Sequence, residues 1–284
     1  MLLMTFINGL TMAALLFIMA VGLNLSFGLL RIVNMTHGSF YLLGGYIGLY
    51  VYKATESWIF GIAAAGIVVA IIAFIEESTL LRRVRGKPTL ETLITLSLAI
   101  IISDLLIVIW GGNPKTIKIP ELLKGYVTLF DANVPIYNIF IFCFACFICL
   151  TLWLILQKTK IGMIIRAGVD NFEITSTLGI NIQLVFTLVF TVAGFLAGIA
   201  GAIGGTYLMV APGEDWRILI YALLVIIIGG MGSFVGTIVG SIIIGMIFSF
   251  GNVYVPQFSL FLMFVPVAII LVVRAKGLFG RITS

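Results

Sequence analysis

The chain has 284 residues, of which 62% are hydrophobic and only 10% are charged, and its formal net charge is +5. Soluble domains carry about 25% charged residues, so this composition excludes a water-soluble protein, and no polar stretch is long enough for a separate soluble domain. The basic residues lie in short loops between apolar runs. They therefore indicate orientation in a membrane and not a nucleic-acid partner.

Apolar runs follow one another along the whole chain and predict an all-α, polytopic transmembrane helical bundle. A helix needs about 20 apolar residues to cross the hydrocarbon core. The first run, 2–30, has no charge before Arg31, so it is predicted to be a retained helix and not a signal peptide. Residues 229–233 split one late run, which predicts a broken or re-entrant helix and a total of eight or nine spans. The predicted spans are 4–29, 38–52, 58–75, 90–110, 134–156, 183–208, 217–230, 234–250 and 256–273.

Three basic segments set the expected orientation. The number of predicted spans between them allows all three to be cytoplasmic, with the N-terminus outside and the C-terminus inside. The loop 111–133 then faces outward although it carries Lys115, Lys118 and Lys124, which opposes the rule. The three segments are formed by Arg82, Arg83, Arg85 and Lys87, by Lys158, Lys160 and Arg166, and by Arg274, Lys276 and Arg281.

Small residues recur every fourth position within several spans. Such ladders let helix backbones approach closely in a membrane, so a compact bundle is expected. The ladders are Ala193, Ala197, Gly201 and Gly205; Gly194, Gly198 and Ala202; Gly232, Gly236 and Gly240; and Gly44 and Gly48.

Neither a metal site nor an enzyme active site is predicted. Cys143, Cys146 and Cys149 lack a fourth cysteine and lie in an apolar span, so they are expected to pack in the core. A single histidine, His37, cannot form a metal site. The segment 111–116 lacks the spacing of a phosphate-binding loop, so the chain itself should bind no ATP and no other cofactor.

Several polar residues in or between the spans are candidates for a transport pathway. Asn24 lies near the end of the first span. Asn34 or Thr36 can cap the second helix, and His37 either belongs to that polar break or lines a pathway. Asp104 lies deep in the fourth span, where an ionisable residue usually faces the bundle interior. It could also serve a proton relay, which keeps an ion-coupled secondary transporter as an alternative function.

The loop 157–182 contains a predicted short amphipathic helix. Asp170 or Asn171 can cap it, Glu173 suits the positive end of its dipole, and Gly179 can end it. A short helix in a cytoplasmic loop is typical of a docking element.

Three segments resemble the branched-chain amino acid permeases of LivH type, and a fourth resembles ABC-importer permeases in general. Glu173 with Gly179 partly matches the E-A-A-x-x-x-G signature of ABC-importer permeases. The other three segments are Gly22–Gly38, the glycine-rich block from Ile228 to Ser233, and the tail from Lys276 to Gly280.

The resemblance implies one permease domain, residues 1–284, in the prokaryotic cytoplasmic membrane. It implies two ATP-binding cassette subunits that dock at Asp170, Asn171, Glu173 and Gly179 and use the ATP. It also implies a second homologous permease, identical or different, and an extracytoplasmic binding protein for branched-chain or related amino acids. Transport would proceed by alternating access along a pathway that includes Asn24, Asn34, His37, Asp104, Gly230 and Gly232.

Overall fold

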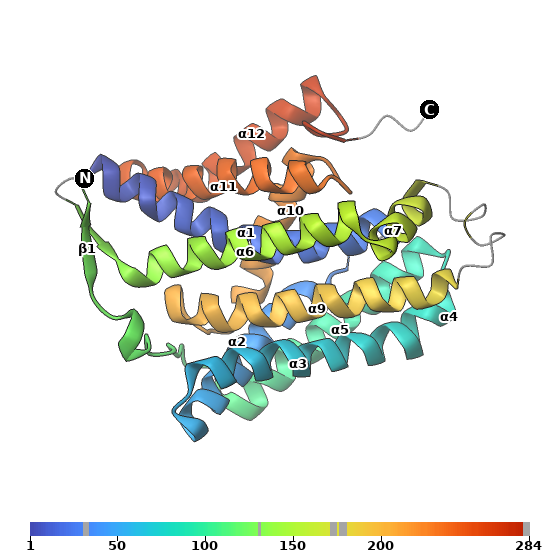
Figure 1. Cartoon of the computed structure of the whole chain (residues 1–284), viewed down its shortest axis with the longest axis horizontal. Coiled ribbons are helices and arrows are strands. Elements are labelled where there is room, and N and C mark those ends of the chain that lie inside the picture. The colour runs from blue at the N-terminus through green and yellow to red at the C-terminus, as the bar shows by residue number, and fades with distance from the viewer. Residues whose placement is uncertain (31–33, 130–131, 171–174, 176–180, 281–284) are drawn as a thin grey trace.

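The computed structural model describes residues 1–30, 34–129, 132–170, 175 and 181–280. This part of the chain is a bundle of long helices with one short β-hairpin (Figure 1). In chain order the elements are α1 (Leu2–Leu30), α2 (Thr36–Thr55), α3 (Trp58–Glu76), the π-helical turn η1 (Glu77–Leu81), α4 (Arg82–Val84), α5 (Pro88–Trp110), the 3-10 turn η2 (Glu121–Leu123), β1 (Tyr126–Leu129), β2 (Ala132–Pro135), α6 (Ile136–Lys158), α7 (Lys160–Asp170), α9 (Ile182–Tyr207), α10 (Glu214–Gly229), α11 (Phe234–Tyr254), the 3-10 turn η3 (Pro256–Phe258) and α12 (Ser259–Val273).

The predicted helical membrane bundle is confirmed. Within the described residues, seven helical segments are long and apolar enough to cross a membrane, and they contain α1, α3, α5, α6, α9, α11 and α12. The other two predicted spans correspond to α2 and α10. The helix α10 has only 16 residues, and α2 carries His37, Lys53 and several Thr, Ser and Tyr residues. Both helices are largely buried inside the bundle.

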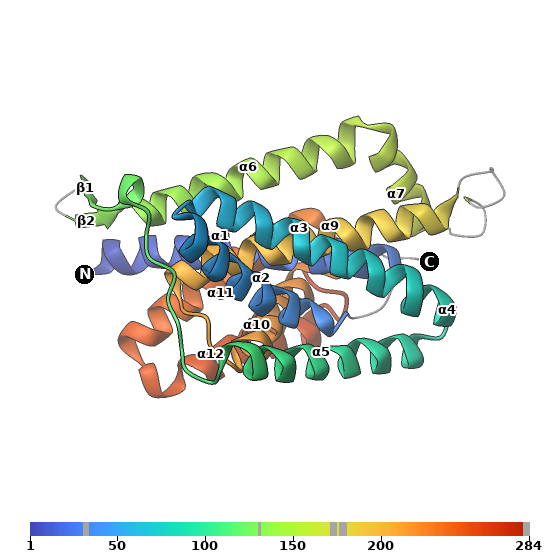
Figure 2. The same cartoon turned by 90° about the horizontal axis from the view of Figure 1, so that it is seen from below.

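The core of the bundle is formed around α1 and α9. The helix α1 packs along α11 and α9, while α2 and α3 pack along the other side of α9. By contrast, α5 and α12 are largely exposed and lie at the lower edge of the molecule in Figure 2, where they flank α10. The N-terminus and the hairpin lie at one end of the bundle, and α4 and α7 lie at the other (Figure 1).

Small residues mediate the closest helix crossings, as the ladders predict. A Cβ added at Gly44 of α2 would lie 2.5 Å from the Cα of Gly198 on α9, and one at Gly236 would lie 2.6 Å from the carbonyl carbon of Gly229. Gly232 differs from its ladder partners, because it is exposed. Its φ of 80° favours glycine at this position.

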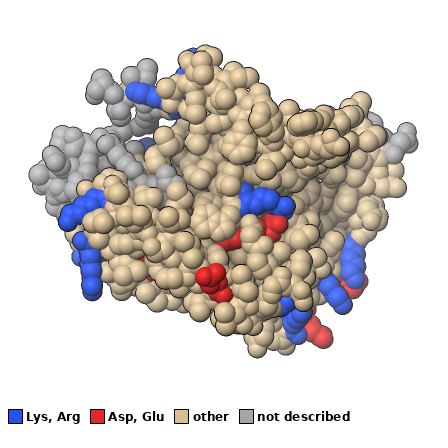
Figure 3. Space-filling view, turned by 180° about the vertical axis from the view of Figure 1, so that it is seen from behind, with Lys and Arg blue, Asp and Glu red and all other residues tan. Residues whose placement is uncertain are grey.

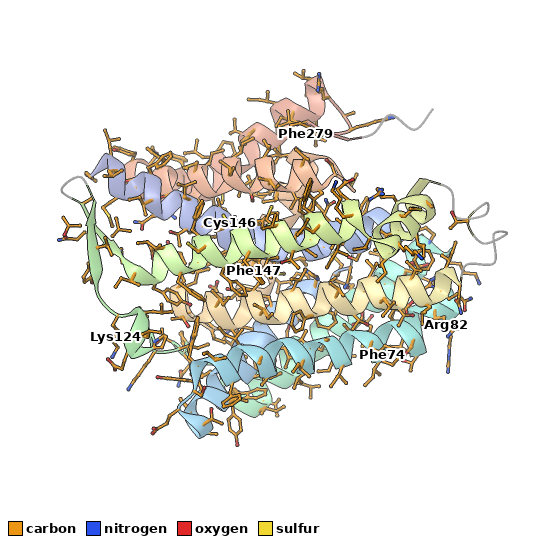
Figure 4. All side chains as sticks on the ribbon, in the orientation of Figure 1. Phe74, Arg82, Lys124, Cys146, Phe147 and Phe279 are labelled. Carbon is orange, nitrogen blue, oxygen red and sulfur yellow. The ribbon has the colours of Figure 1, made fainter. Side chains whose placement is uncertain are left out.

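Two features differ from the sequence-based expectations. The segment 111–133 was expected to be a loop, but β1 and β2 form an antiparallel hairpin with Tyr126 opposite Pro135. The prediction that the cysteines pack in the core is wrong for Cys143 and Cys146, which are exposed on α6; Cys146 is labelled in Figure 4. The reason is that α6 turns a different stripe toward the bundle, formed by Tyr137, Ile141, Ala145, Ile148 and Leu152.

Candidate functional site

Asn24 fastens α1 to the break between α10 and α11. Its Nδ2 donates to the carbonyl oxygen of Ser233 at 2.9 Å and to Oγ1 of Thr237 at 2.7 Å, and its Oδ1 accepts from the amide of Gly232 at 2.6 Å. Two predicted pathway residues, Asn24 and Gly232, are thus brought together. Because both ends of the Asn24 amide are engaged, the arrangement acts as a joint that holds the break in place.

Gly230, another predicted pathway residue, lies where the C-terminal tail crosses the end of α10. A Cβ there would lie 2.8 Å from the Cα of Gly280, and its φ of 100° is also unfavourable for other residues. The tail forms two backbone hydrogen bonds to α10, from Leu278 to Ile228 and from Phe279 to Gly229, each of 2.9 Å. The glycine therefore permits close packing of the tail.

Asn34 and His37 lie in the bundle core at the start of α2. The Oδ1 of Asn34 accepts from the backbone amide of Thr36 at 3.0 Å, but the N-cap residue of α2 is Met35, whose side chain forms no capping hydrogen bond. The Nε2 of His37 lies 3.0 Å from the carbonyl oxygen of Met19 on α1, and the imidazole is fully buried. His37 thus joins α1 to α2, at a distance from the Asn24 joint.

Asp104 does not face the interior of this chain, so that prediction is wrong. Its side chain is exposed on the outward side of α5. Depth in a span can be predicted from sequence, but the direction of a side chain around the helix depends on which stripe packs inward. The stripe of α5 that packs inward consists of Glu91, Thr95, Ala99 and Leu106.

Ser103, the residue before Asp104, contacts a charged cluster that was not predicted from the sequence. The hydroxyl of Ser103 donates to Oδ2 of Asp215 at 2.5 Å, which ties α5 to the first turn of α10. Glu214 forms an ion pair of 2.5 Å with Arg217, whose side chain is 44% exposed. Two acids after Pro-Gly and before an apolar run are typical of a helix start, a signal that could have identified them.

This cluster and Asp104 lie on largely apolar helices that form one face of the molecule. Figure 3 shows acidic and basic side chains near the centre of this face, surrounded by uncharged residues. At about 1.5 Å per residue, Ser103 lies about 23 Å from the start of α5 and about 10 Å from its end. The cluster is therefore within the depth of the membrane and not at its surface.

A second buried polar group lies at the end of the bundle that carries α4. Glu77 is fully buried, accepts from Thr187 of α9, and forms an ion pair with Arg85. The guanidinium of Arg85 also stacks on the ring of Phe186, 4.3 Å from its centroid. This buried ion pair joins Arg85, the residue after α4, to the π-helical turn η1, which in turn contacts α9.

Glu76 extends this polar region toward α2. Its Oε1 accepts from the hydroxyl of Thr36 at 2.9 Å, and the same hydroxyl lies 3.0 Å from the carbonyl oxygen of Thr95. The sequence analysis also missed Glu76 and Glu77. Two consecutive acids directly follow the apolar run of α3, with no Gly or Pro in between. This pattern could have identified them as buried polar residues.

The predicted coupling residues lie mostly outside the described residues. Asn171, Glu173 and Gly179 are not described, and Asp170 is the last residue of α7. The helix α7 contacts α1, α6 and α9, and its Ile165 packs against a small apolar cluster of α9. Within the described residues no group of three His, Cys, Asp or Glu side chains is placed to hold a metal ion.

Comparison with known sequences identifies relatives over nearly the whole chain. The permease protein BraD of the high-affinity branched-chain amino acid transport system of Pseudomonas aeruginosa is 26% identical, and the match covers 97% of this chain and 94% of BraD. The corresponding LivH protein of Escherichia coli K12 is 24% identical, with 96% and 94% covered. A probable LivH of Methanocaldococcus jannaschii is 25% identical, with 82% and 75% covered.

No solved structure matches the chain. The profile of the family described as branched-chain amino acid transport system / permease component matches residues 5–273. The helical membrane bundle agrees with a transport permease, and the match spans all the membrane-length helices. The chain therefore belongs to the permease component family of branched-chain amino acid transport systems.

Proposed function

We propose that the chain is the permease subunit of an ATP-binding cassette importer for branched-chain or related amino acids in the prokaryotic cytoplasmic membrane. All of residues 1–284, including the loop 157–182, acts as one permease domain. A soluble extracytoplasmic protein delivers the amino acid, and two ATP-binding cassette subunits bind and hydrolyse the ATP that drives alternating access. The names of the relatives, which describe high-affinity branched-chain amino acid transport, support this proposal.

The exposed charges at membrane depth on α5 and α10 carry the proposal of a second permease. Asp104 and Arg217 are both exposed in the isolated chain. A charged side chain at the centre of a bilayer costs roughly 2.5–3.5 kcal/mol or more, so lipid is an unfavourable neighbour for them. A second, homologous permease against this face would shield these charges and enclose a polar pathway between the two subunits.

In the proposed orientation the N-terminus and the hairpin are outside, and the C-terminus is cytoplasmic. The opposite ends of the bundle carry Lys124 and Arg82 (Figure 4). Two of the lysines that oppose this orientation have local partners: Lys115 donates to the carbonyl oxygen of Trp110 at 2.5 Å, and Lys124 forms an ion pair with Glu121. The orientation rule counts lysines whether or not they are paired, so these lysines still oppose the proposed orientation.

Reconstitution tests the proposal against ion-coupled transport. We expect uptake of radiolabelled leucine, isoleucine or valine only when proteoliposomes contain this chain, its second permease and the ATPase subunits, with ATP inside and binding protein outside. A protonophore should leave the rate unchanged. Uptake by this chain alone that depends on an ion gradient and is lost in Asp104→Asn would instead favour a secondary transporter.

A further inference from the structure

We propose that the start of α10 binds the charged backbone of the transported amino acid. The carboxylates of Glu214 and Asp215 would receive the α-ammonium group, and the guanidinium of Arg217 would receive the α-carboxylate. This inference rests on the proposed function and assigns the substrate contacts within it.

The state of Asp215 is the first observation behind the proposal. The residue is only 2% exposed, and while Oδ2 accepts from Ser103, Oδ1 is buried without a hydrogen-bond partner among the described residues. A buried carboxylate oxygen without a partner is costly. It is therefore suited to a cationic group that the isolated chain does not supply.

A second unpaired polar atom lies in the same region. The hydroxyl of Tyr46 on α2 is also buried without a hydrogen-bond partner in the described part of the chain. The ring of Tyr46 stacks on Trp110 of α5, with centroids 5.2 Å apart. Unpaired polar groups from α2 and α10 thus lie in a region that α5 closes.

The charges at the start of α10 suit a zwitterion. Successive residues of an α-helix are about 100° apart around its axis, so Glu214 lies between Asp215 and Arg217. The first turn also carries free amide groups and the positive end of the helix dipole. The charges of the two carboxylates, the guanidinium and the helix end nearly cancel. Arg217 has five N–H donors, of which one bonds to Glu214.

The backbone keeps this region closed toward the end that carries the N-terminus. Lys115 and Val210 exchange two backbone hydrogen bonds of 2.9 and 2.7 Å, which fasten the segment after α5 to the connection between α9 and α10. Asp215 and Glu214 are buried in this conformation, whereas Arg217 is exposed on the face proposed for the second permease. Opening this pairing would expose the start of α10.

The test uses the complete transporter in proteoliposomes and compares Asp215→Asn and Arg217→Gln with wild type. Losing one charge-assisted hydrogen bond should lower amino acid uptake about tenfold or more. Binding-protein-stimulated ATP hydrolysis and co-purification of the subunits should be retained, so the amino acid moved per ATP should fall. Glu121→Gln is the matched control, because it removes an exposed acid in the loop before the hairpin.

Each other outcome has a defined meaning. Wild-type uptake in both variants would overturn the proposal. Loss of the second permease from a complex in which this chain is still folded would also overturn it, because Asp215 would then be a subunit contact. If the wild-type complex transports no amino acid, the proposed function fails and not merely the assignment of this site.

Discussion

At the scale of single residues, the long-range hydrogen bonds of Asn24 and the ion pair of Arg85 are two of the polar links between elements. Asn24 connects segments more than 200 residues apart in sequence. Arg85 and Glu77 are only eight residues apart, but they position α9 through Thr187. Both links involve buried polar atoms, so removing one partner should leave the other unsatisfied.

Asn24→Ala should destabilise the protein. It removes hydrogen bonds to Gly232, Ser233 and Thr237, and one unsatisfied buried group alone costs about 1–3 kcal/mol. The thermal unfolding temperature of the purified chain in detergent should fall. Asn113→Ala, in the exposed loop after α5, should leave it unchanged, and equal unfolding temperatures for the two variants would contradict the proposed joint.

Arg85→Ala should have a larger effect than Arg83→Ala. Without Arg85 the carboxylate of Glu77 is a buried charge without a cation, which typically costs about 3–5 kcal/mol, and packing on Phe186 is lost. Arg83 is exposed on α4, two residues before Arg85, and serves as the matched control. The double variant Glu77→Gln with Arg85→Ala should recover part of the loss in a detergent melting assay; an effect of Arg83→Ala as large as that of Arg85→Ala would argue against the ion pair.

At the scale of elements, glycine contacts determine how α10 and α11 meet. Gly229 and Gly236 bring the two backbones together, while the tail packs across Gly230. The two helices are therefore arranged by contacts between backbones more than by large side chains. A side chain at these positions has no space.

Gly236→Val should disrupt the packing of α10 on α11. Its Cβ would overlap the carbonyl group of Gly229, and the added methyl groups increase that overlap. We expect a large loss of monodisperse protein on size-exclusion chromatography in detergent. Val235→Ala changes an exposed neighbour on the same helix and should behave as wild type; normal behaviour of Gly236→Val would show that the two helices can separate without loss of the fold.

The helices could be predicted from sequence, but most site contacts could not. Apolar length and polar interruptions give the position of a span, and all nine predicted spans correspond to helices. The direction of Asp104 depends on the packed stripe of α5, and the pairing of Ser103 with Asp215 depends on the tertiary fold. Neither property is encoded in the local pattern. The role of Asn24 likewise depends on a distant partner.

At the scale of the whole molecule, the two ends of the bundle differ in structure. One end carries the N-terminus and the β-hairpin, and the other carries the basic segment after α3 and the helix α7. The predicted orientation places the second end in the cytoplasm and the first end, which carries Lys124, outside.

Cysteine labelling should establish the orientation. In a variant without Cys143, Cys146 and Cys149, a single cysteine at Lys124 should react with a membrane-impermeant maleimide in intact cells. One at Arg82 should react only after the membrane is opened. Labelling of the Arg82 position in intact cells, with protection of the Lys124 position, would show the reverse orientation.

The polar residues of α2 and the short length of α10 have a consequence for biogenesis. Insertion through a translocon depends on the hydrophobicity of each segment as it leaves the ribosome. The seven membrane-length segments satisfy this condition by themselves, but α2 and α10 do not. These two helices must therefore enter the membrane together with their neighbours, so the interior of the permease is assembled only when the helices around it are already in place.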